Sequence, residues 1–255
     1  MINEIFMKKI VQKKQQPKYS DFVYGIHSTL ELLSAKRRKV SMVYTTKHEI
    51  KAWPKISKLL PKHTPIQFVS KDVLDNIAQT TQHQGIITFT TPFPFEKNIF
   101  DSKNQSFIVV LDGVQDVRNL GAIIRSAYCT GADGIVICGK NSAPLTPASI
   151  HASAGLAEHC KIFIAPSMSF ALQELKSKGF ALYIATLGSG ENAATFKFEQ
   201  PAALIIGNEE SGVSSTTLKS GKRILLPQRR QDISYNASVA AGILMFLMGT
   251  QFKKI

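Results

Sequence analysis

The stretch FIVVLDGVQDVRNLGAIIRSA, residues 107–127, joins a short apolar run to a longer segment with helical periodicity. Phe107 to Leu111 are all apolar, a pattern typical of a strand that is covered on both faces. From Leu120 onward the apolar residues recur at helical spacing, and Gly131 follows where that helix should end. The stretch therefore predicts one strand and one helix of a parallel α/β sheet.

The same alternation continues along the rest of the chain. Apolar runs predict further strands over residues 135–138, 162–165, 180–185, 203–206 and 224–226. Helices are predicted from Pro147 onward, over 170–178 and over 234–248. Thr146 precedes the first of these as an N-cap, with proline in the first helical position. Apolar strands separated by helices place the chain in the α/β class, with a parallel sheet covered on both faces.

Upstream, residues 21–92 predict a smaller α/β module. Its helices are expected over 25–35, 52–60 and 72–78, and its strands over 40–45, 66–69 and 85–90. Residues 93–105 contain Pro94 and a polar run, which favour a linker. Residues 1–20 carry five lysines in a polar context and predict a flexible basic arm. Residues 106–255 then form the larger C-terminal domain.

The composition predicts a polyanionic partner. The chain has 255 residues, with 31 Lys and Arg against 18 Asp and Glu, which gives a formal net charge of +13. A positive excess of this size is typical of proteins that bind nucleic acid. The run Lys36-Arg-Arg-Lys39 fits either a solvated turn or a surface that steers RNA toward the protein.

Membrane, secretory and metal-binding classes receive no support from the sequence. No apolar run approaches the roughly 18 to 20 residues that a spanning helix needs. The first residues lack the features of a secretory signal, so we expect a cytoplasmic protein with no membrane partner. Cys129, Cys138 and Cys160 are odd in number and lack CxxC spacing, so we expect buried, reduced thiols and no metal.

The usual nucleotide and hydrolase motifs do not occur. A dinucleotide fingerprint needs GxGxxG between the first strand and its helix, and residues 112–121 do not supply it. The one GxG of the C-terminal half, Gly188-Ser-Gly190, lacks a third glycine and is interpreted as a mobile loop. P-loop, HExxH and GxSxG motifs are also missing, so the sequence gives no support to a P-loop nucleotide-binding protein, a zincin or a serine hydrolase.

Polar residues follow predicted strands at three places, and the first is the segment that contains Asn119 and Arg125. The two are six positions apart, which puts them roughly 120° apart around a helix axis. They need not share a face, but both can border one crevice. Taken alone, Asn119 could equally be a helix N-cap, and Arg125 a solvated surface charge.

The second and third places lie further along the chain. GNEESGV, residues 207–213, breaks an apolar strand into a glycine-flanked turn with an acidic pair, which a simple connection does not explain. In LLPQRRQDISYNASVA, residues 225–240, either Ser234 or Asn236 should cap the long C-terminal helix. Small residues at the start of that helix allow close approach to the sheet or to a second copy of the chain.

These three segments, in this order, resemble the three motifs of the SpoU family, also called TrmH-type, of RNA ribose 2′-O-methyltransferases. The N-terminal module resembles the small RNA-binding domain of the same family, from Tyr24-Gly-Ile-His27 to His83-Gln-Gly85-Ile. The resemblance covers residues 22–250. The HQG at the exit of the module is most similar to the bacterial branch that modifies a guanosine of 23S ribosomal RNA.

The resemblance implies an S-adenosylmethionine cofactor held in a deep trefoil knot near the C-terminus, and a homodimer that acts on RNA. Its cofactor-binding positions correspond to Gly207, Leu226 and Tyr235. Its catalytic positions correspond to Asn119, Arg125, Glu209, Ser234 and Asn236.

A guanidinium keeps its proton in proteins, so the implied role of Arg125 is to bind the adjacent phosphate or stabilise developing negative charge. Glu209 would orient Arg125 or Asn119. Arg230 and Tyr235 depart from the family's usual Gly and Leu, which puts the shape of the cofactor loop in question. A transfer-RNA methyltransferase and a non-catalytic RNA-binding protein for ribosome assembly remain the alternatives.

Overall fold

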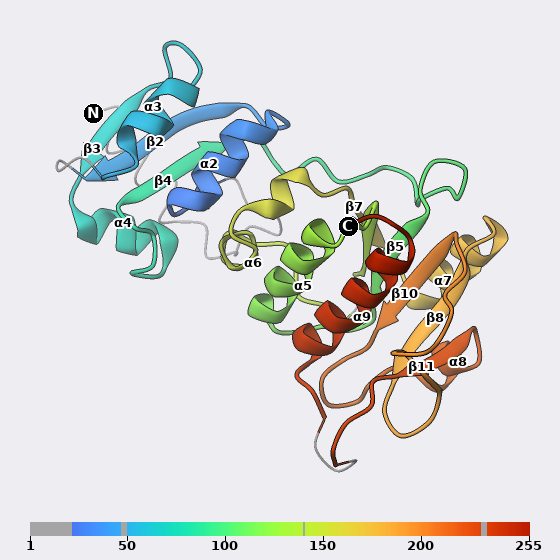
Figure 1. Cartoon of the computed structure of the whole chain (residues 1–255). Helices are drawn as coiled ribbons and strands as arrows, with labels where there is room; N and C mark the ends of the chain where they lie inside the picture. Colours follow the sequence, from blue (N-terminus) through green and yellow to red (C-terminus); the bar gives the residue numbers. More distant parts are fainter. Residues whose placement is uncertain (1–21, 47–49, 140, 231–233) are drawn as a thin grey trace.

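The computed structural model describes residues 22–46, 50–139, 141–230 and 234–255, which form two sheets with their helices (Figure 1). The basic arm predicted over residues 1–20 lies outside the described residues. Residues 22–90 contain a four-stranded sheet, and residues 107–225 contain a seven-stranded sheet. Among the described residues, no helix is long and apolar enough to span a membrane.

The N-terminal sheet is mixed. Its elements are β1 (Phe22–Tyr24), α2 (Ile26–Ala35), β2 (Val40–Thr46), α3 (Trp53–Leu59), β3 (Ile66–Val69), α4 (Lys71–Ala78) and β4 (Ile86–Thr90). The strand order is β1-β4-β2-β3, with β2 and β3 parallel and the other pairs antiparallel. Side chains of α2 and α3 pack with Val43 on one face of the sheet, and α4 packs with Tyr44 on the other.

The C-terminal sheet is parallel at every strand pair of the described chain. Its strands are β5 (Phe107–Leu111), β6 (Gly134–Cys138), β7 (Ile162–Ala165), β8 (Ala181–Thr186), β9 (Glu191–Asn192), β10 (Ala202–Ile206) and β11 (Lys222–Leu225). Their order is β7-β6-β5-β10-β8-β11-β9, so β10 lies between two strands that precede it in the chain.

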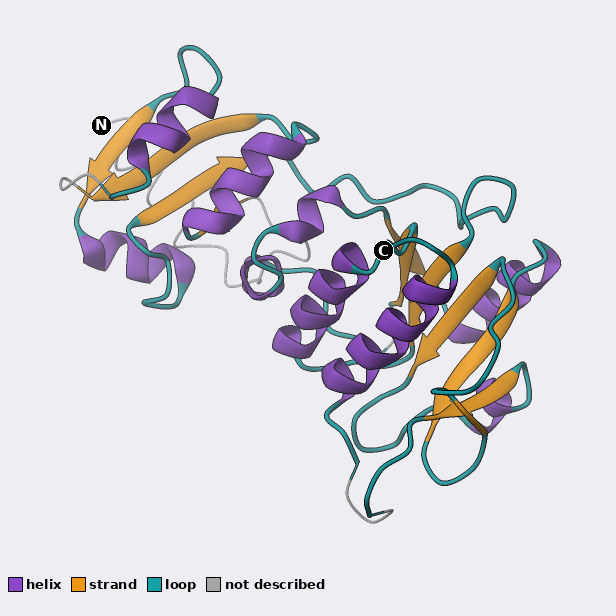
Figure 2. Cartoon of the chain, in the orientation of Figure 1, coloured by secondary structure: helices purple, strands orange, loops and turns teal. Residues whose placement is uncertain are grey.

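Helices cover both faces of this sheet (Figure 2). They are α5 (Val117–Cys129), α6 (Pro147–Ala152), the 3-10 turn η1 (Leu156–His159), α7 (Met168–Ser177), α8 (Ser215–Leu218) and α9 (Ala237–Gln251). Along β5, Val109 joins the core that includes α5, α6 and α9, while Ile108 and Val110 join the core that includes α7. This alternation confirms the predicted parallel sheet with two covered faces.

One alternative left open by the sequence and one prediction from it were wrong. Asn119 does not cap α5, because Asp116 is the N-cap and its carboxylate accepts from the backbone N–H of Arg118 at 2.7 Å. Asn119 is instead the third residue of the helix. Cys138 and Cys160 are buried as expected, but Cys129 at the end of α5 is exposed. A residue on the last turn of a helix can face solvent even when its neighbours are apolar, and the sequence pattern does not resolve this.

The basic run Lys36–Lys39 is neither a fully solvated turn nor a free RNA-steering surface. Lys36 and Lys39 are exposed, but the side chain of Arg38 is 0% exposed and lies 2.8 Å from Glu158 Oε1. Arg37 donates to the backbone oxygen of Cys160 at 2.6 Å. Both arginines therefore join the N-terminal module to the segment around η1, and partners some 120 positions away could not be inferred from the run itself.

Further contacts seal the same junction between the two sheets. Tyr24 stacks on His151 of α6 with ring centroids 4.8 Å apart, and His159 Nε2 lies 2.8 Å from Glu31 Oε2. Gly155 has φ +84°, and a Cβ there would approach the Cα of Ser28 to 2.7 Å. Only glycine tolerates both the conformation and the close approach. Glycine at position 155 therefore allows α2 to pack tightly against η1.

Candidate active site

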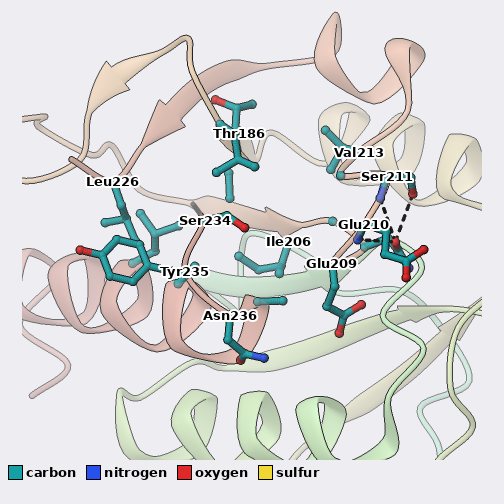
Figure 3. A pocket seen from close by; sticks show the side chains of 18 of the residues that line it. Thr186, Ile206, Glu209, Glu210, Ser211, Val213, Leu226, Ser234, Tyr235 and Asn236 are labelled. Atoms are coloured by element: carbon teal, nitrogen blue, oxygen red, sulfur yellow. Dashed lines mark hydrogen bonds between the residues drawn. The ribbon is translucent and has the colours of Figure 1, made fainter. Parts of the chain in front are cut away.

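A cavity of about 600 Å³ lies at the carboxyl ends of β8, β10 and β11 (Figure 3). Three loops line it: the loop after β8, the turn after β10 and the segment from β11 to α9. Their lining residues include Thr186, Leu187, Ser189, Ile206, Gly207, Asn208, Glu209, Ser211, Val213, Leu226, Gln228, Ser234, Tyr235, Asn236, Ala240 and Leu244. Ligands of open α/β sheets bind outside the carboxyl ends of the strands, so this is the expected place for a site.

The turn after β10 is built by Asn208. Its Oδ1 accepts from the backbone N–H groups of Glu210 and Ser211 at 2.9 and 3.0 Å, and its Nδ2 donates to Gly113 O at 2.8 Å. A Cβ at Gly207 would lie 2.6 Å from the carbonyl carbon of Gly212. The turn can therefore close only around glycine, which leaves main-chain groups at the cavity wall.

Three of the predicted catalytic residues form one hydrogen-bonded chain. Asn236 Nδ2 donates to Asn119 Oδ1 at 3.2 Å, and Asn119 Nδ2 donates to Glu209 Oε1 at 2.7 Å. Each residue comes from a different one of the three polar segments. The structure thus brings together side chains that are up to 117 positions apart in the sequence.

The cap of α9 explains why Asn236 is held in place. Its Oδ1 accepts from the backbone N–H groups of Ser238 at 2.9 Å and Val239 at 3.4 Å, so Asn236 is the N-cap of α9. Of the two predicted caps, Asn236 rather than Ser234 has this role. Since the cap uses the oxygen, the amide nitrogen of Asn236 remains available to Asn119.

Arg125 does not join this chain. It is exposed on α5, lies outside the cavity lining, and forms no hydrogen bond or ion pair with another described residue. Of the two predicted partners of Glu209, the structure pairs it with Asn119, which donates to its carboxylate; among the described residues, no hydrogen bond or ion pair joins Glu209 to Arg125.

The positions predicted to bind a cofactor all line the cavity: Gly207, Leu226 and Tyr235. Tyr235 lies beside Leu226 at one end of it (Figure 3), and its hydroxyl donates to Pro227 O at 3.5 Å. Ser234 also lines the cavity. Tyr235 as a whole is 42% exposed, so it borders the opening of the cavity and does not fill it.

The loop after β8 is a part of the site that the sequence analysis missed. Thr186, Leu187 and Ser189 line the cavity, although the nearby glycines had been interpreted as a mobile loop. Thr186 Oγ1 donates to Ser189 O at 2.6 Å, and a Cβ at Gly190 would lie 2.8 Å from Arg223 O. The pattern Gly188-Ser-Gly190 directly after a strand could have indicated this loop, because glycine allows the backbone of the loop to pack closely against β11.

A second cavity of about 360 Å³ lies on the other side of the Asn208 turn. Asp112, Gln115, Asn141 and Ser211 are among its lining residues. Burial raises the pKa of Asp112, while a hydrogen bond from Thr217 opposes that shift. Among the described residues, no group of three or more His, Cys, Asp or Glu side chains is placed to hold a metal ion.

Two family matches cover the two parts of the chain. Residues 106–246 match the SpoU rRNA Methylase family, and residues 22–96 match a family described as RNA 2'-O ribose methyltransferase substrate binding. The first match alone spans more than half of the chain.

Individual relatives agree with these matches. The chain is 29% identical over 245 residues to an uncharacterized tRNA/rRNA methyltransferase, slr0955, of Synechocystis sp., covering 92% of this chain and 64% of that protein. It is also 29% identical over 237 residues to the 23S rRNA (guanosine-2'-O-)-methyltransferase RlmB of Acinetobacter baylyi, covering 89% of this chain and 95% of that protein.

Solved structures share the fold. A crystal structure of an RNA 2'-O ribose methyltransferase superposes with a TM-score of 0.80 at 20% identity, covering 96% of this chain and 94% of that one. The SpoU methyltransferase AviRb from Streptomyces viridochromogenes in complex with AdoMet superposes with a TM-score of 0.75 at 20% identity, covering 92% and 91%.

Proposed function

The chain belongs to the SpoU rRNA Methylase family, and we propose that it transfers a methyl group from S-adenosylmethionine to the 2′-hydroxyl of a ribose in RNA. The observation that carries this proposal is the hydrogen-bonded chain Asn236–Asn119–Glu209 at the edge of the 600 Å³ cavity. It unites the three segments on which the family resemblance rests.

The cavity fits the cofactor. Its volume lies within the roughly 300–1,000 Å³ typical of small-molecule sites. Ile206, Leu226 and Leu244 supply an apolar lining for a planar base, and the close turn at Gly207 exposes main-chain polar groups beside them. Gly207, Leu226 and Tyr235 would hold the cofactor, which supplies an electrophilic methyl group on a sulfonium centre.

The protein's own residues then have to position the ribose and ease loss of the hydroxyl proton. Glu209, by accepting from Asn119, fixes the orientation of that amide at the site. Arg125 cannot accept a proton, so it would bind the phosphate next to the target ribose or stabilise the developing alkoxide. Ser234 and Asn236 would shape the opening of the site.

A homodimer is part of the proposal. Val239, Ile243 and Phe246 lie on one face of α9 and are 49%, 37% and 57% exposed. Because these apolar side chains have no cover in a single copy, a second copy that packs on α9 would bury them. The same packing would bring a partner surface toward α5, where Arg125 forms no hydrogen bond or ion pair within the described part of the chain.

The deep trefoil knot also belongs to the proposal. Its support is the insertion of β10 between β5 and β8, together with the return of the segment after β11 to the turn after β10 at the cavity. The domain boundaries are proposed as predicted: an arm over 1–20, an RNA-binding module over 21–92, a linker over 93–105 and the knotted domain over 106–255.

For the substrate, we favour a guanosine of 23S ribosomal RNA, with transfer RNA as the alternative. The named activity of the Acinetobacter relative and the net charge of +13 support an RNA of this kind. An RNA substrate is also what supports the expected cytoplasmic location.

Transfer of a tritiated methyl group to RNA tests the proposal. The purified protein should label total RNA from cells that lack it, and mapping of ribose methylation should then place the label in ribosomal RNA. Label found only in transfer RNA would select the alternative substrate. A protein that binds RNA but transfers no label would contradict the enzymatic function and leave the ribosome-assembly role.

A further inference from the structure

The RNA-binding role proposed above for the N-terminal module does not say which of its surfaces contacts RNA, and one candidate is an exposed surface made of Lys55, Lys58, Lys62, Ile66 and Phe68. We call it the β3 edge surface, and we propose that it binds a single-stranded segment of the substrate RNA. The inference rests on the proposed function for its choice of RNA as the partner.

The charge of this region is of one sign. Residues 50–71 contain five lysines and one histidine but no Asp or Glu. All five lysines are exposed, and none forms an ion pair with another described residue. Uncompensated lysines on one surface attract a polyanion and bind its phosphates, which also makes the binding salt-dependent.

An aromatic side chain lies on the same surface. Phe68 is 52% exposed and Ile66 is 41% exposed on β3, the outermost strand of the sheet. An unpaired base stacks readily on an exposed aromatic ring, and every base offers a face for this contact. Lysines beside an exposed phenylalanine therefore fit a strand of RNA better than they fit a purely ionic partner.

The strand register places Ile66 and Phe68 on the sheet face that α3 helps to cover. Ile66 pairs with Val43 and Phe68 with Thr45, so both point to the sheet face on which Val43 packs against Ile56 of α3. On α3, Ile56 is buried while Lys55 and Lys58 face solvent. Lys62 lies in the turn that leads from α3 into β3. The lysines of α3 and of the turn after it thus belong to the same side of the module as Ile66 and Phe68.

The position in the fold favours an extended contact with RNA. β3 and α3 lie on the side of the module remote from the C-terminal sheet (Figure 1). The module is fixed to that sheet by the buried ion pair between Arg38 and Glu158. RNA bound at the β3 edge surface and at the cavity would therefore be held at two separated points of the protein.

Fluorescence anisotropy with a labelled single-stranded 20-nucleotide RNA of mixed sequence tests whether the lysines of the β3 edge surface bind RNA phosphates. In the full-length protein, Lys55→Ala/Lys58→Ala/Lys62→Ala should weaken binding about tenfold or more and lower the slope of log K against log salt by about 2. The matched control removes three lysines elsewhere: Lys103→Ala/Lys176→Ala/Lys178→Ala should change affinity less than about threefold. Equal losses in both variants would overturn the surface in favour of general charge attraction.

Substitutions of Phe68 test whether an RNA base stacks on its ring. Phe68→Leu should weaken RNA binding about fivefold or more although it keeps an apolar side chain, and Phe68→Trp should restore it. Equal binding by the Leu and Trp variants would overturn stacking. An exposed edge strand could instead pair with another protein chain, so a change of oligomeric state in the Phe68 variants, with RNA binding unchanged, would also contradict the proposal.

A second readout separates this inference from the proposed function. S-adenosylmethionine binding, measured by calorimetry, should be the same in all of these variants, because the β3 edge surface is distant from the cavity. Wild-type protein that transfers no methyl group would contradict the proposed function, whereas unchanged RNA affinity in the lysine and Phe68 variants would contradict only the β3 edge surface.

Discussion

Arg38 and Glu158 form an ion pair that is sealed from solvent: Nη1 and Oε1 are 2.8 Å apart, and both side chains are 0% exposed. One residue belongs to the N-terminal module and the other to η1. A charge pair buried in this way is costly to break, because removing one partner leaves the other charge unpaired in a poorly hydrated place.

Arg38→Met should therefore destabilise the protein by about 3–5 kcal/mol in urea unfolding. The exposed neighbour supplies the control, since Lys39→Met should change the unfolding free energy by no more than about 0.5 kcal/mol. The double variant Arg38→Met/Glu158→Leu should recover part of the loss. If it is no more stable than Arg38→Met, the unpaired charge is not the cause of the destabilisation.

Asp133 should make stability depend on pH in acid. Burial alone raises its pKa, but hydrogen bonds from Lys254 and from the backbone N–H groups of Ser106 and Phe107 outweigh burial and hold the pKa below its usual 3.8. A lowered pKa in the folded state stabilises the protein above the unfolded-state pKa, and that stabilisation is lost as the pH falls through the folded-state pKa.

Asp133→Asn should thus cost about 1–2 kcal/mol at neutral pH and almost nothing once the pH has fallen below the folded-state pKa of Asp133. Chemical denaturation across this range would measure the difference. A gap between the two proteins that stays constant down to low pH would assign the effect to packing at residue 133 and not to its charge.

If Arg125 has the role proposed above, Arg125→Ala should lower the rate of methyl transfer by about 100-fold or more, because it would remove the positive charge proposed to bind the phosphate or stabilise the developing alkoxide. Cofactor affinity by calorimetry should stay nearly intact, since Arg125 lies outside the cavity lining. Arg125→Lys should recover only part of the rate, because a point charge does not reproduce the planar fork of the guanidinium. Full activity of Arg125→Ala would remove this residue from the mechanism.

Asn119→Asp should give a pH-dependent loss of activity. The new carboxylate would lie about as close to Glu209 as the amide does now, 2.7 Å, and two carboxylates at that distance share a proton with one raised pKa. Activity should therefore be lost at neutral pH and recover in part toward acid, where the shared proton restores the hydrogen bond. Asn119→Ala is the control, and an identical pH profile for both variants would contradict the shared proton.

The exposed face of α9 predicts the oligomeric state. Ile243→Glu/Phe246→Glu should convert a dimer to a monomer in light scattering, because charges would occupy the apolar contact. Ile255→Glu changes a residue that is 53% exposed outside this face and should leave the dimer intact. A wild-type protein that is monomeric at micromolar concentration would contradict the proposed dimer directly.

The alternation of strands and helices was readable from local patterns. β5 has the predicted bounds, and Thr146 caps α6 as expected, because apolar periodicity and capping are properties of neighbouring residues. The convergence of Asn119, Glu209 and Asn236 followed from resemblance to a known family and not from spacing.

The contacts that the sequence could not predict are those between residues far apart in the chain. In the sequence, Arg37 and Arg38 have the pattern of an exposed basic run. Only the fold brings Cys160 and Glu158 into contact with them. Thr186 and Ser189 were missed for the same reason, since their place at the cavity depends on strand order and not on the residues beside them.

The central position of β10 has a consequence for biosynthesis. Until residues 202–206 leave the ribosome, β5 and β8 lack the neighbour that both pair with. A nascent chain that ends earlier therefore exposes two unpaired apolar strand edges, which are prone to misassembly. The larger sheet should complete only after most of the polypeptide has been synthesised, while the four-stranded module, finished by residue 90, can fold as soon as it emerges.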